Sequence, residues 1–143
     1  MLKRTDLILL LLREKPLDRI RLMKALFLIW LRSGRNIPGF FEFVPYMYGP
    51  CSFELYDEID RAGRERFLTQ LSGSYPRWSP YYITERGKKA ADQASQEINA
   101  TTLRLVRAVA QEVSELDFHN LLRRVYAEAP DFATNTVVKS LRQ

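Results

Sequence analysis

The sequence feature that most constrains the fold is an apolar run, residues 40–48, that ends at a Gly-Pro pair. Gly49 can adopt backbone angles that other residues avoid, and Pro50 cannot donate a hydrogen bond within a central strand. Two residues later, Ser52 is placed to cap a helix by accepting hydrogen bonds from its free N–H groups. We therefore predict a short strand over residues 41–47, a sharp break, and then a helix that begins directly after the serine.

Hydrophobic periodicity predicts a mostly helical chain around this junction. Helices are expected at residues 5–14, 18–33, 53–62, 85–97, 100–116 and 118–128, with one more short helical piece within residues 131–143. Candidate capping residues are Thr5 or Asp6 for the first helix, Thr84 for the fourth and Asp117 for the last.

Two further short strands are expected on either side of a turn-rich segment. They span residues 67–71 and 81–84, and together they read as a β-hairpin. Three helices followed by a two-stranded hairpin form the winged-helix arrangement, with the third helix in the recognition position and the hairpin as the wing. We predict an α+β, mostly helical fold. A winged-helix-like domain would span residues 1–98, with a C-terminal helical lobe, residues 99–143, packed on it.

The bulk composition fits one domain, or one domain with an added helical lobe. The chain has 143 residues, of which 46% are hydrophobic and 12% aromatic, enough to bury a core. Its longest apolar run near the start, residues 7–12, is too short to span a membrane, and we see no secretory signal. The single cysteine, Cys51, excludes an internal disulfide and a thiolate metal cage. We therefore expect a cytoplasmic protein without membrane association, metal or cofactor.

The positive charge is concentrated near the start of the chain. The formal net charge is +5, and the first 35 residues hold nine Lys/Arg against three Asp/Glu. Residues 36–98 hold seven against nine, and residues 99–143 hold six against five. A basic face of this kind suits a polyanion or an acidic protein, or it serves only to keep the surface solvated.

Four segments, in order along the chain, are similar to motifs of one family. They are Leu22-Met23-Lys24-Ala25-Leu26-Phe27-Leu28-Ile29, Phe43-x-Pro45-Tyr46-x-Tyr48-Gly49-Pro50-x-Ser52-x-x-Leu55-Tyr56, Tyr82-x-Thr84-Glu85-x-Gly87 and Leu122-x-x-Val125-Tyr126-x-x-x-Pro130-Asp131-Phe132. In these segments the chain resembles the SocA-like Panacea antitoxins and the related YwgA-like proteins, which form a winged-helix-like family. The resemblance implies a small cytosolic protein that acts as an antitoxin or adaptor holding a partner protein, or as a regulator. It implies no catalysis.

Residues with catalytic chemistry are scarce. His119 is the only histidine and Cys51 the only cysteine, so a hydrolase triad or a histidine-based metal site lacks partners. We expect His119 to be structural. Cys51 is either a small buried residue at a tight turn or a thiol activated by the helix that follows it. We therefore expect a protein that is not an enzyme.

A protein-binding surface is our first hypothesis for function. The third helix carries four carboxylates, which DNA phosphates would repel and which suit a basic protein partner. The candidate partner-binding residues are Tyr48, Gly49, Pro50, Glu54, Asp57 and Glu58, and the partner could be a toxin. Tyr46 and Tyr56 either extend this surface or, as we expect, pack in the core together with Tyr48.

A winged-helix DNA-binding regulator is the alternative. Basic residues follow the third helix and flank the wing, where they could contact the phosphates of duplex DNA. These candidates are Arg61, Arg64, Arg77, Trp78, Arg86, Lys88 and Lys89. A second basic patch is expected from Arg19, Arg21, Lys24, Arg32 and Arg35. The long helix over residues 100–116 could form a homodimer, as paired half-sites on DNA would require.

Overall fold

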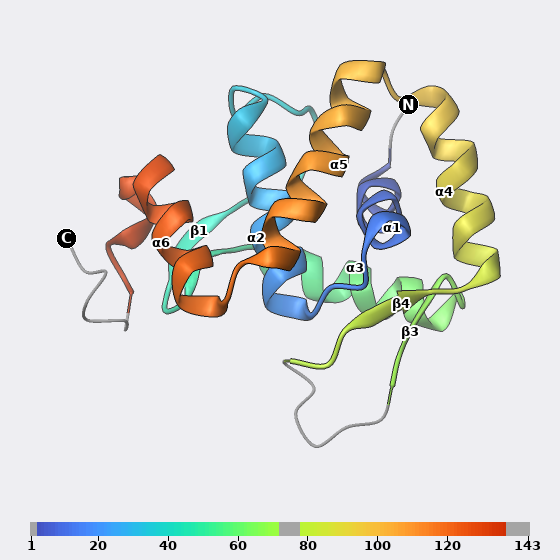
Figure 1. Cartoon of the computed structure of the whole chain (residues 1–143), viewed down its shortest axis with the longest axis horizontal. Helices are drawn as coiled ribbons and strands as arrows, with labels where there is room; N and C mark the ends of the chain where they lie inside the picture. The colour runs from blue at the N-terminus through green and yellow to red at the C-terminus, as the bar shows by residue number, and fades with distance from the viewer. Residues whose placement is uncertain (1–2, 72–77, 137–143) are drawn as a thin grey trace.

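The computed structural model describes residues 3–71 and 78–136, and in these ranges the chain is a mixed α+β protein built mostly of helices. Six α-helices, one short 3₁₀ helix and two small antiparallel hairpins make up the described part (Figure 1). In chain order the elements are α1 (Arg4–Glu14), α2 (Arg19–Arg32), β1 (Val44–Tyr46), β2 (Gly49–Cys51), α3 (Phe53–Arg64), β3 (Leu68–Gln70), β4 (Tyr81–Ile83), α4 (Glu85–Glu97), α5 (Ala100–Glu115), α6 (Phe118–Glu128) and η1 (Pro130–Ala133).

The helices predicted from periodicity are confirmed, with ends that differ by one or two residues. Two of the predicted caps are confirmed as well. The Thr84 hydroxyl accepts a hydrogen bond from the Gly87 N–H (3.0 Å), and an Asp117 carboxylate oxygen accepts one from the Asn120 N–H (2.8 Å). Each of these caps satisfies one of the free N–H groups that every helix start exposes.

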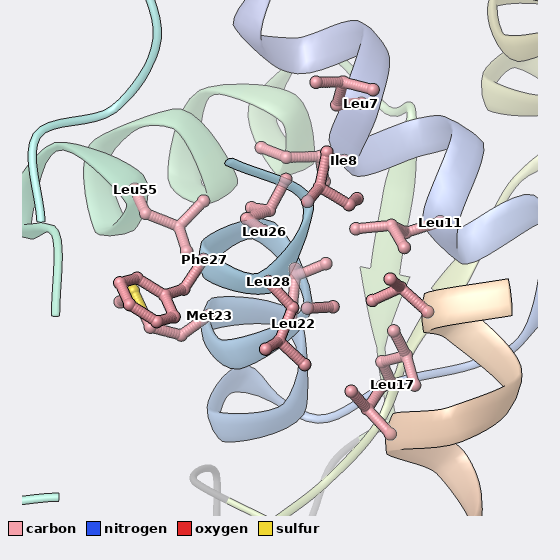
Figure 2. Close-up of a cluster of buried hydrophobic side chains, with 14 of the residues drawn as sticks. Leu7, Ile8, Leu11, Leu17, Leu22, Met23, Leu26, Phe27, Leu28 and Leu55 are labelled. Carbon is pink, nitrogen blue, oxygen red and sulfur yellow. The ribbon is translucent and has the colours of Figure 1, made fainter. Parts of the chain in front are cut away.

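The core is organised around α1 and α2. The six residues from Leu7 to Leu12 in α1 are all buried, because α1 is enclosed by α2, α3, α4 and α5. Leu7, Ile8 and Leu11 of α1 lie beside the leucines of α2, and Leu55 of α3 adjoins them (Figure 2). The same cluster of buried side chains continues into α5, α6 and η1, so the N-terminal and C-terminal helices share one hydrophobic core.

Two arginines of α2, together with Arg35 just after it, attach the C-terminal helices to the rest of the molecule. The Arg32 guanidinium pairs with Glu112 of α5 (2.7 Å) and with Glu128 of α6 (2.6 Å). The hydrogen bond from Arg32 is the main cause that lowers the pKa of Glu112. Arg21 pairs with Asp18 and donates to backbone carbonyls at the end of α5, while Arg35 pairs with Asp131.

The predicted second basic patch therefore does not form a free basic surface. Of its five members, three arginines are paired inside the molecule and Lys24 is buried, with 3% of its surface exposed. The remaining one, Arg19, places its guanidinium 4.9 Å from the centre of the Tyr56 ring. The charge excess of the first 35 residues is thus largely neutralised by acidic groups that are distant in sequence.

The strand predicted over residues 41–47 is confirmed only at Val44–Tyr46 (β1), and the expectation that the chain breaks away after it is wrong. The chain instead forms a hairpin, in which β1 and β2 pair antiparallel across a two-residue turn. Gly49 adopts a φ of +91°, a conformation that favours glycine and allows the chain to reverse. Pro45 and Pro50 face each other, so the two residues without an N–H share one position of the ladder. The Gly-Pro pair therefore begins a strand, whereas we expected it to end one.

Two predicted caps are also wrong. Ser52 precedes α3, but its hydroxyl makes no capping hydrogen bond and is buried without a partner among the described residues. Its backbone N–H donates to the sulfur of Met23 (3.3 Å), because the residue is held against α2. The first helix starts one residue early, with Lys3 as its N-cap, and Asp6 accepts from the Lys3 N–H (2.8 Å).

The hairpin expected over residues 67–84 is confirmed as β3 paired with β4. The turn between these strands lies outside the described residues, as does most of the tail in which a final helical piece was expected. One backbone bridge joins Leu17, between α1 and α2, to Tyr81 of β4, whose N–H donates to the Leu17 carbonyl (2.9 Å). This bridge fixes the hairpin against the first two helices.

Candidate functional site

The outer face of α3 is acidic and open. Leu55, Ile59 and Ala62 face the core. Asp57 and Asp60 point away from the core and are exposed. Neither aspartate forms an ion pair or hydrogen bond within the described ranges, so both carboxylates remain available on this face, with the exposed Arg64 one helical turn beyond Asp60.

The other two carboxylates of α3 are used inside the molecule. Glu54 pairs with Arg4 of α1 (2.7 Å) and also accepts from the backbone N–H of Glu42 (3.0 Å). The hydrogen bond from the Glu42 backbone and the Arg4 guanidinium together lower the pKa of Glu54. Glu58 accepts from the hydroxyl of Thr5 (2.9 Å) and pairs with Arg61 (2.8 Å). Of the predicted partner-binding carboxylates, Asp57 alone has no ion pair or hydrogen bond with another described residue. Asp60 was not among those candidates.

An exposed apolar cluster lies beside the start of this face. Val44 and Tyr46 are on the same side of β1, Met47 is in the turn, and Phe53 opens α3; each is between 40% and 55% exposed. The rings of Tyr46 and Phe53 pack edge to face, with centroids 5.4 Å apart. We call these four residues the ribbon patch. The expectation that Tyr46 packs in the core is wrong, because the hairpin turns this side chain outward.

The predicted loop over Tyr48, Gly49 and Pro50 is largely buried. Gly49 and Pro50 are buried, and Tyr48 is half-buried with its ring 5.6 Å from that of Phe118. A Cβ atom on Gly49 would lie 3.1 Å from a methyl of Leu122 and 3.2 Å from Cε of Lys24. The loop is therefore packed between α2 and α6, and only Tyr48 of the three reaches the surface.

A buried polar cluster lies beneath the β1–β2 hairpin. The ammonium group of Lys24 donates to the carbonyl of Pro50 (3.1 Å), and burial lowers the pKa of Lys24 from 10.5 to about 8. Cys51 is buried and its sulfur lies 3.7 Å from the Tyr56 hydroxyl. These groups hold α2 against β2. Within the described ranges no three His, Cys, Asp or Glu residues gather in a way that could hold a metal ion.

A groove of about 900 Å³ collects several of the residues predicted for DNA binding. It lies between α1, the end of α3 and α4, and Arg61, Arg86 and Lys89 line it together with Lys3. Three carboxylates line the same groove: Asp6, Glu65 and Glu97. Because the charges nearly balance, the groove offers a phosphate backbone little net attraction.

The remaining members of the predicted DNA-binding set are dispersed. Arg64 is exposed at the end of α3, and Lys88 pairs with Glu85 on the surface of α4 (3.3 Å). Trp78 is exposed and packs its ring on Phe118 of α6, with centroids 5.4 Å apart. Arg77 lies outside the described residues.

Sequence reasoning missed the ribbon patch because it missed the hairpin. The alternation of Val44, Pro45 and Tyr46 is too short to show which side of a strand is covered. The exposure of Phe53 could have been predicted from the sequence. Phe53 shares one helix face with Asp57 and Asp60, opposite the apolar residues Leu55 and Ile59.

Comparisons with known proteins add no family. No protein-family model matches the chain, and none of the curated proteins is significantly similar to it. Of the helices in residues 3–71 and 78–136, none has the length and apolar character needed to cross a bilayer.

Proposed function

We propose that this chain is a non-enzymatic protein-binding module that neutralises or escorts a partner protein, as an antitoxin or an adaptor does. The observation that carries the proposal is the outer face of α3, where Asp57 and Asp60 are exposed and have no ion-pair partner in the described part of the chain. Phosphates would be repelled by such a face, whereas a basic protein surface would be attracted.

The topology supports a winged-helix interpretation of the fold. The helices α1, α2 and α3 precede the β3–β4 hairpin, and the bridge from Leu17 to Tyr81 ties that hairpin to the helices. In this interpretation α3 occupies the recognition position. A winged helix whose recognition helix presents carboxylates is better suited to a protein than to a DNA groove.

The family resemblance points the same way. Its motif Tyr82-x-Thr84-Glu85-x-Gly87 has a physical role here, because Thr84 caps α4 and Gly87 allows its first turn to contact the chain at Phe67. The motif around Gly49 and Pro50 likewise forms the buried junction between α2, β2 and α6. These motifs are consistent with an antitoxin-like scaffold, and they leave recognition to the exposed residues around them.

A DNA-binding regulator is the second candidate function, favoured by one observation. Arg61, Arg86 and Lys89, which are separate in sequence, converge on the groove between α1 and α4. In this function the groove would follow the phosphate backbone, and α3 would have to face away from the duplex.

A titration with labelled random-sequence duplex DNA at about 50 mM and 150 mM salt separates the two functions. We expect the wild-type chain to show no binding tighter than about 100 µM even at low salt, the weak limit for non-specific DNA-binding proteins. The double variant Asp57→Lys/Asp60→Lys should bind measurably and lose that binding with added salt, because the repulsive charges have been reversed.

Micromolar binding by the wild-type chain that weakens steeply with salt would contradict the proposal. If Arg61→Ala and Lys89→Ala then reduced this affinity, the groove would be the DNA-binding surface and the regulator function would replace the protein-binding one. Glu115→Lys serves as the matched charge control, because it adds the same charge per substitution at the end of α5, away from the outer face of α3 and outside the groove lining.

A further inference from the structure

We propose that the ribbon patch is the hydrophobic anchor of the interface and that its occupant is a basic protein segment carrying an apolar residue. This inference rests on the proposed protein-binding function and adds the chemistry of the partner. The patch comprises Val44, Tyr46, Met47 and Phe53. They are four of the seven large hydrophobic side chains that the described residues leave exposed, and they fall within ten positions of the sequence.

The patch is held in place from below and from its edge. On the inner side, β2 is buried and bonded to α2 through Lys24 and Pro50. On the outer edge of β1, Asn135 donates to the carbonyl of Pro45 (3.2 Å) and Thr136 donates to that of Met47 (3.3 Å). The strand edge is therefore already satisfied, so a partner would contact the side chains rather than add a strand.

The patch has the composition of an interface centre. Aromatic residues and methionine are enriched at the centre of protein interfaces, where they supply large contact areas. Tyr46 and Phe53 fix each other through their edge-to-face contact, so little side-chain freedom remains to be lost when a partner binds. An aliphatic or aromatic side chain of the partner would pack against these two rings, with the exposed Met47 of the adjoining turn adding apolar surface.

The charges around the patch select a basic partner. Asp57 lies one helical turn beyond Phe53, Asp60 lies nearly one turn further, and Glu42 is exposed near the start of β1. The basic residue Arg4 also lies near the ribbon patch, but its guanidinium is paired with Glu54. The guanidinium of Arg19 lies over the Tyr56 ring. Among the described residues around the ribbon patch and on α3, three carboxylates without an ion pair, those of Glu42, Asp57 and Asp60, thus outnumber the two guanidinium groups without one, those of Arg19 and Arg64. This excess favours Lys or Arg beside the anchoring residue.

The test uses three labelled peptides of equal length and helical spacing, one of Lys and Leu, one of Glu and Leu, and one of Lys and Ser. Fluorescence anisotropy measures their binding to the full chain at about 50 mM and 150 mM salt. We expect binding of the Lys/Leu peptide only. Phe53→Ser should weaken it about tenfold or more, as loss of a central anchor does, and Asp57→Lys should weaken it similarly and reduce its salt dependence.

The matched control is Leu71→Ser, which removes a side chain that is 65% exposed but lies after β3, away from the ribbon patch. It should leave peptide affinity unchanged, and circular dichroism should show that every variant is folded. Equal binding of the Glu/Leu peptide, or equal effects of Phe53→Ser and Leu71→Ser, would overturn the inference.

The outcomes also separate this inference from the function on which it rests. If Asp57→Lys weakens binding and Phe53→Ser does not, the ribbon patch is not the anchor, while the proposal that the acidic face of α3 binds a protein is retained. If neither variant matters, both proposals fail. A dimer in sedimentation equilibrium that Phe53→Ser dissociates would assign the patch to a second copy of this chain and would also overturn the inference.

Discussion

Replacing Gly87 with alanine is expected to lower the free energy of unfolding by about 3 kcal/mol or more, at or beyond the upper end for overpacked sites. A Cβ atom at this position would lie 2.0 Å from the carbonyl oxygen of Phe67 and 2.7 Å from a side-chain carbon of Ile83. The Phe67 carbonyl cannot retreat easily, because it accepts the Thr84 N–H (3.1 Å) at the cap of α4. The whole junction between β3, β4 and α4 would have to shift.

Gly63→Ala is the matched control for this prediction. Gly63 lies inside α3, and a Cβ atom there would meet only a methyl of Leu68 at an ordinary 3.8 Å. Alanine should therefore stabilise the protein by about 0.5–1 kcal/mol through its higher helix propensity. Urea denaturation followed by circular dichroism measures both variants. Unfolding free energies within about 1 kcal/mol of each other would contradict the close contact at Gly87, given the propensity gain expected at Gly63.

Lys24→Met is expected to remove a pH dependence of stability that the wild-type chain shows. Burial lowers the pKa of Lys24 to about 8, while the unfolded chain keeps the ordinary value of 10.5. Between these values the unfolded state binds more protons, so the free energy of unfolding rises with pH. From pH 7 to 9.5 the rise should be about 2 kcal/mol, and the buried charge costs about 3 kcal/mol at pH 7.

The methionine variant should be at least as stable as the wild type at pH 7, since a well-packed apolar side chain replaces a buried charge. Lys89→Gln is the control, because Lys89 is exposed and its removal should leave the slope intact. Denaturation should be measured no higher than pH 9.5. Burial raises the pKa of Tyr81 and Tyr126, and above pH 10 these groups lower stability as pH rises. If the free energy of unfolding of the wild-type chain did not rise between about pH 7 and pH 9.5, the burial of the Lys24 ammonium group would be contradicted.

The helices were predictable from sequence because their signals are local. Apolar spacing repeats over three or four turns, and Thr84 and Asp117 act on N–H groups three residues away. The β1–β2 hairpin was not predictable in this way. Its signal is a Gly-Pro pair that equally fits the end of a strand, and the choice depends on Lys24 and Leu122, which approach Gly49 from distant helices.

The candidate site was predictable only in part, for a related reason. The acidic character of α3 is visible in the sequence, but which carboxylates are free depends on contacts across the fold. Glu54 is paired with Arg4 and Glu58 with Arg61, whereas Asp57 and Asp60 have no such partner among the described residues. Likewise the basic start of the chain suggested a polyanion site, and its arginines instead bind carboxylates from α5, α6 and η1.

The most direct test of the central claim is site-specific photo-cross-linking in cells of the source organism, with a photoreactive residue at position 64 on α3 or at position 93 in the groove. Arg64 lies one helical turn beyond Asp60, and both Arg64 and Gln93 are exposed, so the two positions are comparable in access and both aspartates are kept. The acidic-face account predicts one discrete protein adduct from position 64, lost when Asp60→Lys is added, and none from position 93. Nucleic-acid adducts, or a protein adduct from position 93 alone, would contradict it.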